Sequence, residues 1–420
     1  MNALAREGGE LMLDGVSLGE VARRFGTPCY VYSRAAIEAA YREFDEGLAG
    51  IDHLVCYAVK ANSNLAVLDV LQRMGAGFDI VSGGELARVL AAGGSAGRVI
   101  FSGVGKSEAE LRAALAAGIK CFNVESEPEL ERLNAIAHSM GVQAPVSLRV
   151  NPDVDARTHP YISTGLAGNK FGIPHDRALA AYRHAAALPH LRVIGIGCHI
   201  GSQILETAAL DEALERVLEL VDALAAQGIR LEHLDLGGGF GIRYRDEVPP
   251  DIGNYCRRLA ARLAGRGFQV MLEPGRAITG PAGVLLTRVE YLKVDKAKRF
   301  AVVDASMSEL IRPALYGSWH DIVPVVENAA RRAERYDVVG PVCESSDVLG
   351  VDRPLAVAPG EVLAILATGA YGMAMASNYN SRPRPPEVLV DRGEAIEVRS
   401  REAPEALFAL EKRLGSPRAR

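Results

Sequence analysis

The sequence predicts an α/β protein built on a (β/α)8 TIM barrel, with a second domain that is rich in β-strands. Between residues 54 and 275, eight short apolar runs alternate with helical stretches, and about 250 residues is the usual size of such a barrel. After residue 275 helical windows become rare, and Pro/Gly turns join β-type runs. A chain of 420 residues is also too long for one ordinary core, which favours two domains.

Each expected barrel strand is a short, mainly apolar run. The eight runs are LVCYAVK, FDIVS, VIFSG, CFNVE, VSLRVN, VIGIGCHIG, HLDLGGG and VMLEPG. The stretches between them repeat apolar residues every three and four positions, which is typical of a helix that packs one face on a sheet. They include residues 84–92, 108–117, 127–140, 176–187 and 210–227. A doubly wound open sheet is the alternative, but it would need a glycine-rich turn where this chain has Lys60.

The second domain is expected to combine the two ends of the chain. Strands are predicted in GVLLTRVEYLKV, RFAVVDAS, RYDVVGPVC, EVLAILAT and EVLVDRG. Near the start, a strand-like ELMLDGV precedes a short helix and the strand CYVYS. We therefore expect the barrel at residues 28–279, a β-rich domain at 1–27 and 280–412, and a flexible tail at 413–420.

The composition excludes several classes of protein. With 49% hydrophobic and 24% charged residues, the chain is expected to be a soluble globular protein. A net charge of −5 argues against a nucleic-acid or anionic-membrane partner. Six cysteines without a CxxC pair, and no apolar segment near the start, favour a reduced, cytoplasmic protein. The nine histidines show no metal-ligand spacing, so no metal site is expected.

Polar residues stand at the carboxyl ends of almost all the expected strands, where barrel enzymes carry their chemistry. A barrel with a purely structural role would not need polar groups on so many strands. In chain order these positions are Lys60, Asp79, Ser82, Ser102, Glu125, Asn151, His199, Ser202, the glycines at 237–241, Glu273 and Arg276.

Lys60 closes an apolar run, where burial disfavours a free ammonium group. A Schiff base to an aldehyde cofactor would neutralise it, although a lone lysine more commonly reaches into solvent. The glycines at 237–241 follow the seventh strand, a usual phosphate site of barrels. Glu273 could keep a pyridine nitrogen protonated, and His199 could stack on a flat ring. A salt-bridged glutamate and a core histidine are the alternatives.

The chain resembles the fold-type III pyridoxal-phosphate-dependent decarboxylases nearly from end to end. The resemblance rests on strings that stand in family order: YAVKAN, FDIVSGGEL, THPYISTG, NKFGI, CHIGSQ, LDLGGGFG, EPGR, RPALYGSWHDI, GPVCESSD and NYNSRPRPPEVLV. It implies a barrel of alanine-racemase type and pyridoxal 5′-phosphate as cofactor. It also implies decarboxylation of meso-2,6-diaminopimelate to L-lysine and CO2, the last step of lysine biosynthesis by the diaminopimelate route.

The resemblance implies a role for each matching residue of the cofactor site. Lys60 is expected to hold the cofactor covalently, His199 to stack on its ring and Glu273 to contact the ring nitrogen. The other expected cofactor-binding residues are Asp79, Ser202, Gly239, Gly275, Arg276 and Tyr371.

The resemblance also implies the residues that bind substrate. Arg276, Arg312 and Tyr316 are expected to bind its distal carboxylate, and Tyr371 to touch both cofactor and substrate. Cys343, as proton donor, and Glu344, as ligand of the distal amino group, are expected to come from the second subunit of a homodimer.

Charge matching favours diaminopimelate over ornithine or arginine. Two arginines offer bidentate forks for a carboxylate, and a substrate without a distal carboxylate would leave them unpaired. Two other classes remain open. An amino-acid racemase would need a second base on the opposite face of the cofactor. A non-catalytic homologue should have lost Lys60, the glycine loop or Cys343, all of which this chain retains. A carbohydrate-phosphate barrel without pyridoxal cofactor is a more distant alternative.

Overall fold

The computed structural model describes residues 3–155, 170–296 and 298–414. It divides into two compact units, which are described separately. The barrel unit comprises Arg34–Ala282 and Gly369–Ala374, and the β-rich unit comprises Met1–Ser33, Gly283–Thr368 and Met375–Arg420. The string THPYISTG lies outside the described residues, as does most of the expected tail.

The barrel unit contains a closed ring of eight parallel strands, as the sequence predicts. The ring closes because β13 pairs with β5 and β8 pairs with β9, both in parallel. A two-residue strand, β10 (Ile173–Pro174), adds to the edge of β9. The barrel strands are β5 (His53–Ala58), β6 (Gly77–Ile80), β7 (Val99–Phe101), β8 (Cys121–Val124), β9 (Ala144–Asn151), β11 (Leu191–Gly197), β12 (His233–Asp235) and β13 (Gln269–Leu272).

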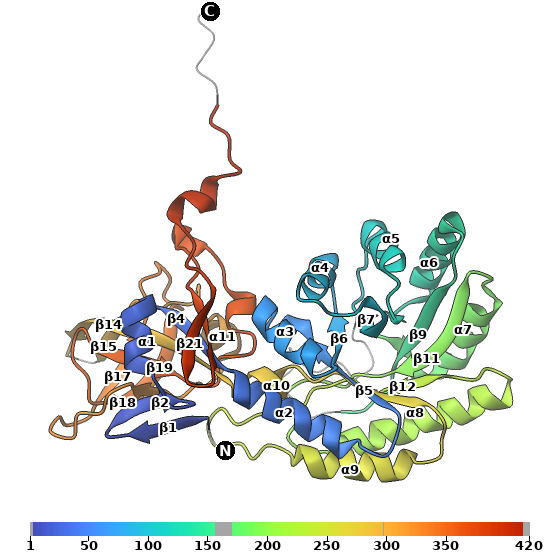
Figure 1. The fold of residues 1–420 in the computed structure, drawn as a ribbon, viewed down its shortest axis with the longest axis horizontal. Helices are drawn as coiled ribbons and strands as arrows, with labels where there is room; N and C mark the ends of the chain where they lie inside the picture. Colours follow the sequence, from blue (N-terminus) through green and yellow to red (C-terminus); the bar gives the residue numbers. More distant parts are fainter. Residues whose placement is uncertain (1–2, 156–169, 297, 415–420) are drawn as a thin grey trace, which may run out of the picture. The chain divides into compact units, whose positions relative to one another are not determined.

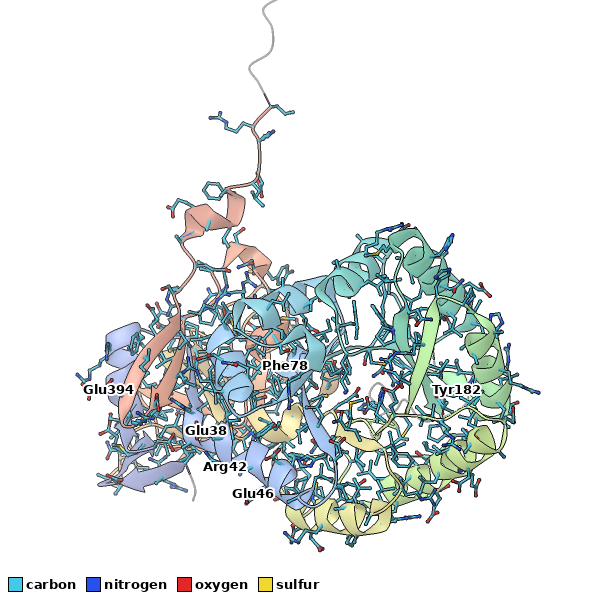
Figure 2. The ribbon with its side chains drawn as sticks, turned by 45° about the vertical axis from the view of Figure 1, so that its right-hand side comes forward. Glu38, Arg42, Glu46, Phe78, Tyr182 and Glu394 are labelled. Atoms are coloured by element: carbon cyan, nitrogen blue, oxygen red, sulfur yellow. The ribbon has the colours of Figure 1, made fainter. Side chains whose placement is uncertain are left out.

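Helices connect the strands and lie on the outside of the ring (Figure 1). Tyr182 shows how one of them docks, because its buried hydroxyl donates to the Gly195 carbonyl oxygen of β11 at 2.8 Å (Figure 2). The helices of this unit are α2 (Arg34–Gly47), α3 (Leu65–Arg73), α4 (Gly83–Ala91), α5 (Glu108–Ala117), α6 (Glu127–Met140), α7 (His175–Ala187), α8 (Ala208–Ala226), α9 (Ile252–Leu263) and α10 (Arg276–Thr279), with one-turn 3-10 helices η1 (Val59–Ala61) and η2 (Ala96–Arg98).

Serines fix the points at which three of these helices begin. The side chains of Ser82, Ser107 and Ser126 each accept a hydrogen bond from a backbone N–H in the first turn of α4, α5 and α6. In α5 the Glu110 side chain completes a capping box. Ser82, one of the polar residues noted at the strand ends, therefore serves as a helix cap.

An apolar cluster fills part of the barrel interior. Its members come from β5, β7, β8, β11 and β13, and each is at most 4% exposed: Leu54, Cys56, Ile100, Cys121, Ile194 and Met271. Nearer the carboxyl ends of the strands the buried residues become polar, with Asp79 on β6, Asn123 on β8 and Asp235 on β12. The barrel interior is therefore apolar in this cluster and polar nearer the carboxyl ends of the strands, where barrel enzymes carry their sites.

The β-rich unit holds a mixed sheet with the strand order β18-β17-β15-β14-β4-β20-β21. In addition, β19 pairs with β14, and β16 pairs with β19. A small sheet of β1, β2 and β3 and the helix α1 pack on the same core. The elements are β1 (Leu4–Glu7), β2 (Glu10–Leu13), β3 (Val16–Ser17), α1 (Leu18–Phe25), β4 (Cys29–Ser33), β14 (Gly283–Val294), β15 (Arg299–Val303), α11 (Arg312–Tyr316), β16 (Ile322–Pro324), β17 (Glu334–Val339), β18 (Val348–Leu355), β19 (Val362–Ile365), β20 (Glu387–Asp391), β21 (Glu394–Arg399) and the 3-10 helices η4 (Met373–Met375), η5 (Tyr379–Ser381) and η6 (Pro404–Phe408).

The predicted domain boundaries need correction. The sequence placed residues 28–279 in the barrel, but β4 pairs with β14 and β20 in the β-rich unit. All five residues of β4 are buried, and a strand that is buried on both faces carries no pattern that tells which sheet it joins. Residues 280–282 and Gly369–Ala374 belong to the barrel unit.

Among the described residues, no helix is long and apolar enough to cross a membrane.

Candidate active site at the carboxyl ends of the barrel strands

Lys60 lies in η1, directly after β5. Its Nζ is 3.3 Å from the Oδ2 of Asp79, whose side chain is fully buried on the neighbouring strand β6. Burial acts to lower the pKa of Lys60, but the charges of Asp79, Tyr371 and Glu273 outweigh it and raise the pKa above its ordinary value. The structure therefore places an amine and a carboxylate side by side at the first two strands.

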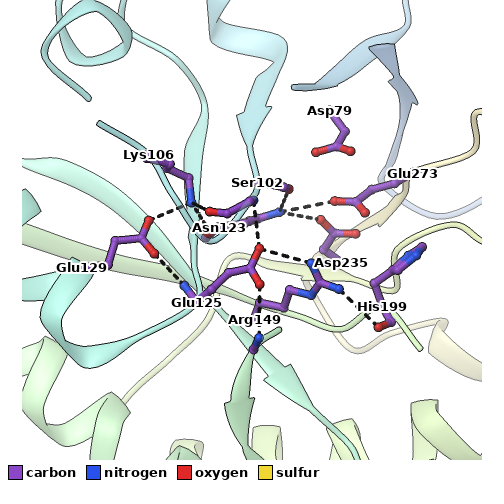
Figure 3. A network of polar contacts seen from close by, with 12 residues as sticks. Asp79, Ser102, Lys106, Asn123, Glu125, Glu129, Arg149, His199, Asp235 and Glu273 are labelled. Atoms are coloured by element: carbon purple, nitrogen blue, oxygen red, sulfur yellow. Dashed lines mark hydrogen bonds and ion pairs between the residues drawn. The ribbon is translucent and has the colours of Figure 1, made fainter. Parts of the chain in front are cut away.

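Glu273 follows β13 and is half-buried, next to the fully buried carboxyls of Asp79 and Asp235. The Nδ2 of Asn123 donates to Asp235 Oδ2 at 3.3 Å and to Glu273 Oε1 at 3.4 Å (Figure 3). Burial, opposed by a hydrogen bond from the Gly237 N–H, raises the pKa of Asp235 to about 6. Burial, followed by the charges of Asp235 and Asp79, raises the pKa of Glu273 well above its usual range. Asp235 and Glu273 therefore lack a sufficient positive counter-charge.

The glycine loop after β12 is held against its neighbours too closely for any side chain. A Cβ at Gly238 would lie 2.1 Å from the Glu273 carbonyl oxygen, and one at Gly239 would lie 2.2 Å from the Gly201 carbonyl oxygen. Gly239 also has a φ of +93°, which disfavours other residues. The loop therefore connects the segments that follow β11 and β13, and no described residue accepts a hydrogen bond from the Gly239 N–H.

His199 is oriented by the same loop. The Gly238 N–H donates to its Nδ1 at 3.2 Å, which assigns the ring proton to Nε2 if the imidazole is neutral. Burial, and then the charges of Arg149 and Lys60, lower the pKa of His199 well below its ordinary value. A neutral, flat imidazole is suited to stacking on a heteroaromatic ring.

Arg276 contacts two other residues of the predicted site, Ser202 and Tyr371, and also Tyr244. It is 6% exposed, and its Nη2 donates to Ser202 Oγ at 3.0 Å while Nη1 donates to the Tyr244 hydroxyl at 2.6 Å. Its guanidinium carbon lies 4.8 Å from the ring centroid of Tyr371. Tyr371 has a φ of +56° and donates its N–H to the Ala61 carbonyl oxygen. A tyrosine held in the left-handed region is unusual and typical of functional sites.

Two predicted strand-end groups instead hold loops together. Glu125 accepts hydrogen bonds from Arg149 and from the backbone N–H groups of Gly103 and Gly172. The Oδ1 of Asn151 accepts from the N–H of Asp153, which closes a turn. Ser102 accepts a hydrogen bond from Asn123 and joins the carboxyl network.

Sequence reasoning missed the residues one layer below the strand ends, namely Asn123, Arg149 and Asp235, and also Lys106 and Tyr244. Three of them had a signal. Each is a polar residue inside an apolar run, in CFNVE, VSLRVN and HLDLGGG, at a position of the run that faces the same side as the strand-end residue two places on. Lys106 and Tyr244 lie in loops and carried no such signal.

Four predicted site residues lie in the β-rich unit. Arg312 begins α11 and is 6% exposed, and its guanidinium carbon is 5.7 Å from the Tyr316 ring centroid. Cys343 is exposed, unlike the other five cysteines, all of which are free and buried. The Glu344 carboxylate next to it accepts a hydrogen bond from Tyr379.

Comparison with known proteins places this geometry in a family. Residues 34–280 match the family model described as pyridoxal-dependent decarboxylase, pyridoxal binding domain. The diaminopimelate decarboxylase of Pseudomonas aeruginosa is 59% identical over 412 residues, covering 98% of this chain and 99% of that relative. The chain belongs to the diaminopimelate decarboxylase family.

Further members of this family are similar over comparable lengths. The diaminopimelate decarboxylase of Vibrio cholerae is 56% identical and the match covers 97% of each chain. The crystal structure of the Helicobacter pylori enzyme complexed with L-lysine superposes with a TM-score of 0.90 at 42% identity, covering 94% of this chain and 98% of that one. The family is pyridoxal-dependent, and the protein is a decarboxylase with pyridoxal phosphate as its cofactor.

The barrel site fits this cofactor. The Asp79 Oδ1 is buried and has no hydrogen-bond partner among the described residues. The raised pKa of Glu273 indicates that the charge of Lys60 does not balance the acidic groups around it, and a protonated pyridine nitrogen would add positive charge there. The Gly239 N–H without an acceptor can donate to a phosphate.

Proposed function

We propose that this protein converts meso-2,6-diaminopimelate to L-lysine and CO2, with the residues that the sequence predicts. One observation supports the proposal most: the chain matches diaminopimelate decarboxylases over nearly its whole length. The charges of Lys60 and Glu273 also both interact with the buried Asp79 carboxylate. The Helicobacter pylori relative was crystallised with L-lysine, the expected product.

In this proposal the barrel unit holds the cofactor. Lys60 holds its aldehyde carbon covalently, with Asp79 beside the attached nitrogen. Glu273 would contact the ring nitrogen, and neutral His199 would stack on the ring. Ser202, Gly239, Gly275 and Arg276 hold the phosphate, and Tyr371 lies beside Arg276. When bound, pyridoxal phosphate accepts the electron pair that is released as CO2 leaves.

Glu273 would keep a proton on the ring nitrogen, because its carboxyl lies beside two buried acidic side chains and gains most from a cationic partner. Lys60 would be the covalent anchor of the cofactor when neither substrate nor product is bound. Cys343 returns a proton to the carbon that has lost CO2. An exposed thiol on a polar loop is suited to that transfer, whereas the five buried cysteines are not.

The distal end of the substrate requires charges of both signs. Arg276, Arg312 and Tyr316 bind the distal carboxylate, and Glu344 binds the distal ammonium group. Both arginines have guanidinium groups that are largely buried and already oriented by an aromatic ring. Preorganised arginine forks favour a carboxylate over a neutral or cationic group.

The experiment that tests the reaction is incubation of the purified protein, loaded with pyridoxal phosphate, with meso-diaminopimelate, ornithine and arginine separately. The expected result is CO2 release from diaminopimelate and little from the other two. The Lys60→Ala protein is the blank. Release from ornithine but not from diaminopimelate would contradict the proposed substrate.

We also propose a cytoplasmic homodimer in which Cys343 and Glu344 of one subunit serve the site of the other. Free cysteines throughout the described chain favour the cytoplasm. Co-expression of Lys60→Ala with Cys343→Ala chains tests the shared site. Half of randomly formed dimers are hybrids with one intact site of two, so about a quarter of wild-type activity should return. No return of activity would show that each site is built from one chain.

A further inference from the structure

The loop that carries Cys343 and Glu344, residues 340–347, is fixed at its base. The buried Asp347 carboxylate accepts hydrogen bonds from the backbone N–H groups of Met307, at 2.6 Å, and Val342, at 2.7 Å. Within the loop, the Glu344 N–H donates to the Val342 carbonyl oxygen and the Asp347 N–H donates to the Glu344 carbonyl oxygen. The backbone of this cysteine loop is therefore well defined, but these contacts leave the Glu344 side chain undetermined.

A second segment, residues 377–382, braces the cysteine loop with two successive side chains. The Tyr379 hydroxyl donates to Glu344 Oε1 at 2.6 Å, and the Oδ1 of Asn380 accepts from the Cys343 N–H at 3.3 Å. Within the part of the chain that the structure describes, this is the one hydrogen bond of the Glu344 side chain.

The bracing segment is itself anchored in the β-rich unit. The Ser377 N–H donates to the Ser308 carbonyl oxygen at 2.9 Å, and the Asn378 Nδ2 donates to Glu402 Oε2 at 2.7 Å. Arg382 Nη2 donates to the Asp304 carbonyl oxygen at 2.8 Å. Asn380 has a φ of +54°, a left-handed conformation that asparagine tolerates better than most residues. Tyr379 is thus presented from a fixed backbone.

We propose that Tyr379 is a positioning residue that determines the preference for a substrate with a distal ammonium group, because it holds the Glu344 carboxylate in place. The inference rests on the proposed role of Glu344. An exposed glutamate has three rotatable side-chain bonds, and fixing them before the substrate arrives removes that ordering cost from binding. A hydroxyl that donates to a carboxylate forms a short, charge-assisted bond, as the distance of 2.6 Å shows. The hydrogen bond to Glu344 raises the pKa of Tyr379, so the hydroxyl keeps its proton and remains the donor.

Tyr379→Phe tests the proposal with the pyridoxal-phosphate-loaded protein. The ring stays and only the hydroxyl is lost, so the KM for meso-diaminopimelate should rise about fivefold to tenfold while kcat stays within about twofold. With 2-aminopimelate, which has both carboxylates but no distal amine, the same substitution should leave the KM unchanged. Tyr291→Phe is the matched control, because Tyr291 is an exposed tyrosine of the same unit, on β14.

Glu344→Gln separates this inference from the proposed function. Glu344→Gln should raise the KM for diaminopimelate at least as much as Tyr379→Phe, and adding Tyr379→Phe to it should change little further. If Glu344→Gln raises the KM and Tyr379→Phe does not, the positioning role is overturned. An equal effect of Tyr379→Phe on both substrates would also overturn it, since that indicates general damage to the loop. If Glu344→Gln leaves the KM unchanged, the proposed role of Glu344 fails, and the role of Tyr379 fails with it.

Discussion

The buried ion pair of Lys106 and Glu129 is hydrogen-bonded to Asn123 and Glu125 of the active-site network. We expect its removal to lower the stability of the barrel unit by a large, measurable amount. The Lys106 side chain is 1% exposed, and its Nζ donates to Glu129 Oε1 at 2.7 Å and to the carbonyl oxygens of Gly103 and Asn123 (Figure 3). The Glu129 side chain is 9% exposed, and its second oxygen accepts from the Glu125 N–H. This single ammonium therefore ties together the segments that follow β7 and β8.

Lys106→Met keeps most of the side-chain volume but leaves the Glu129 carboxylate buried without its cation. Breaking one partner of a buried pair typically costs about 3–5 kcal/mol, whereas exposed pairs contribute at most ~1 kcal/mol. Because the long helices belong to the barrel unit, urea unfolding followed by far-ultraviolet circular dichroism reports on this unit. We expect the free energy of unfolding to fall by about 3–5 kcal/mol and the protein to retain pyridoxal phosphate less tightly.

The double variant Lys106→Met, Glu129→Leu is the control. It removes both charges, and replacement of a buried pair by apolar residues is often neutral, so most of the lost stability should return. A loss below ~1 kcal/mol for Lys106→Met would refute the reasoning, because the pair would then behave like one on the surface. Failure of the double variant to recover would assign the loss to packing instead of to the unpaired carboxylate.

Three further predictions concern Gly239 in the glycine loop, the buried carboxyl of Asp235, and Arg276. Gly239→Ala should weaken pyridoxal-phosphate binding at least about tenfold in an absorbance titration, because its Cβ would lie 2.2 Å from the Gly201 oxygen; Gly228→Ala, at a φ of +82° with nothing within 4 Å, controls for backbone strain. The pKa of Asp235 is raised from 3.8 to about 6, so wild-type stability falls as pH rises through this interval. Asp235→Asn should then stabilise the cofactor-free protein by roughly 2–3 kcal/mol at pH 8 and much less at pH 4 in urea unfolding; an equal gain at both values would contradict the assignment. Arg276→Lys loses the fork that reaches both Ser202 and Tyr244, so both cofactor affinity and the KM for diaminopimelate should worsen, and an unchanged KM would remove Arg276 from the substrate site.

The barrel was predictable from sequence because its pattern is local. Each strand is a short apolar run and each helix repeats at three and four, so the observed α5 and α6 begin and end where the sequence places them. The strand-end residues Lys60, Asp79 and Glu273 could be found because parallel barrel strands deliver their carboxyl ends to one rim.

The remaining features depend on contacts between distant segments. The sequence of β4 cannot tell which sheet it joins, because all of its residues are buried wherever it pairs. The contribution of Asp235 follows from its position beside Asn123 and Glu273, which come from two other strands. The hydrogen bond from Tyr379 to Glu344 joins loops 35 residues apart in the chain, and no spacing rule anticipates it.

The most direct test of the account is to find which amine holds the cofactor. The protein is incubated with pyridoxal phosphate, the bond between lysine and aldehyde is fixed with borohydride, and peptides are analysed by mass spectrometry. The account predicts one modified peptide, labelled at Lys60, and no label in the Lys60→Ala protein. Label at Lys106 or Lys120 in place of Lys60, or an unlabelled wild-type protein, would contradict it.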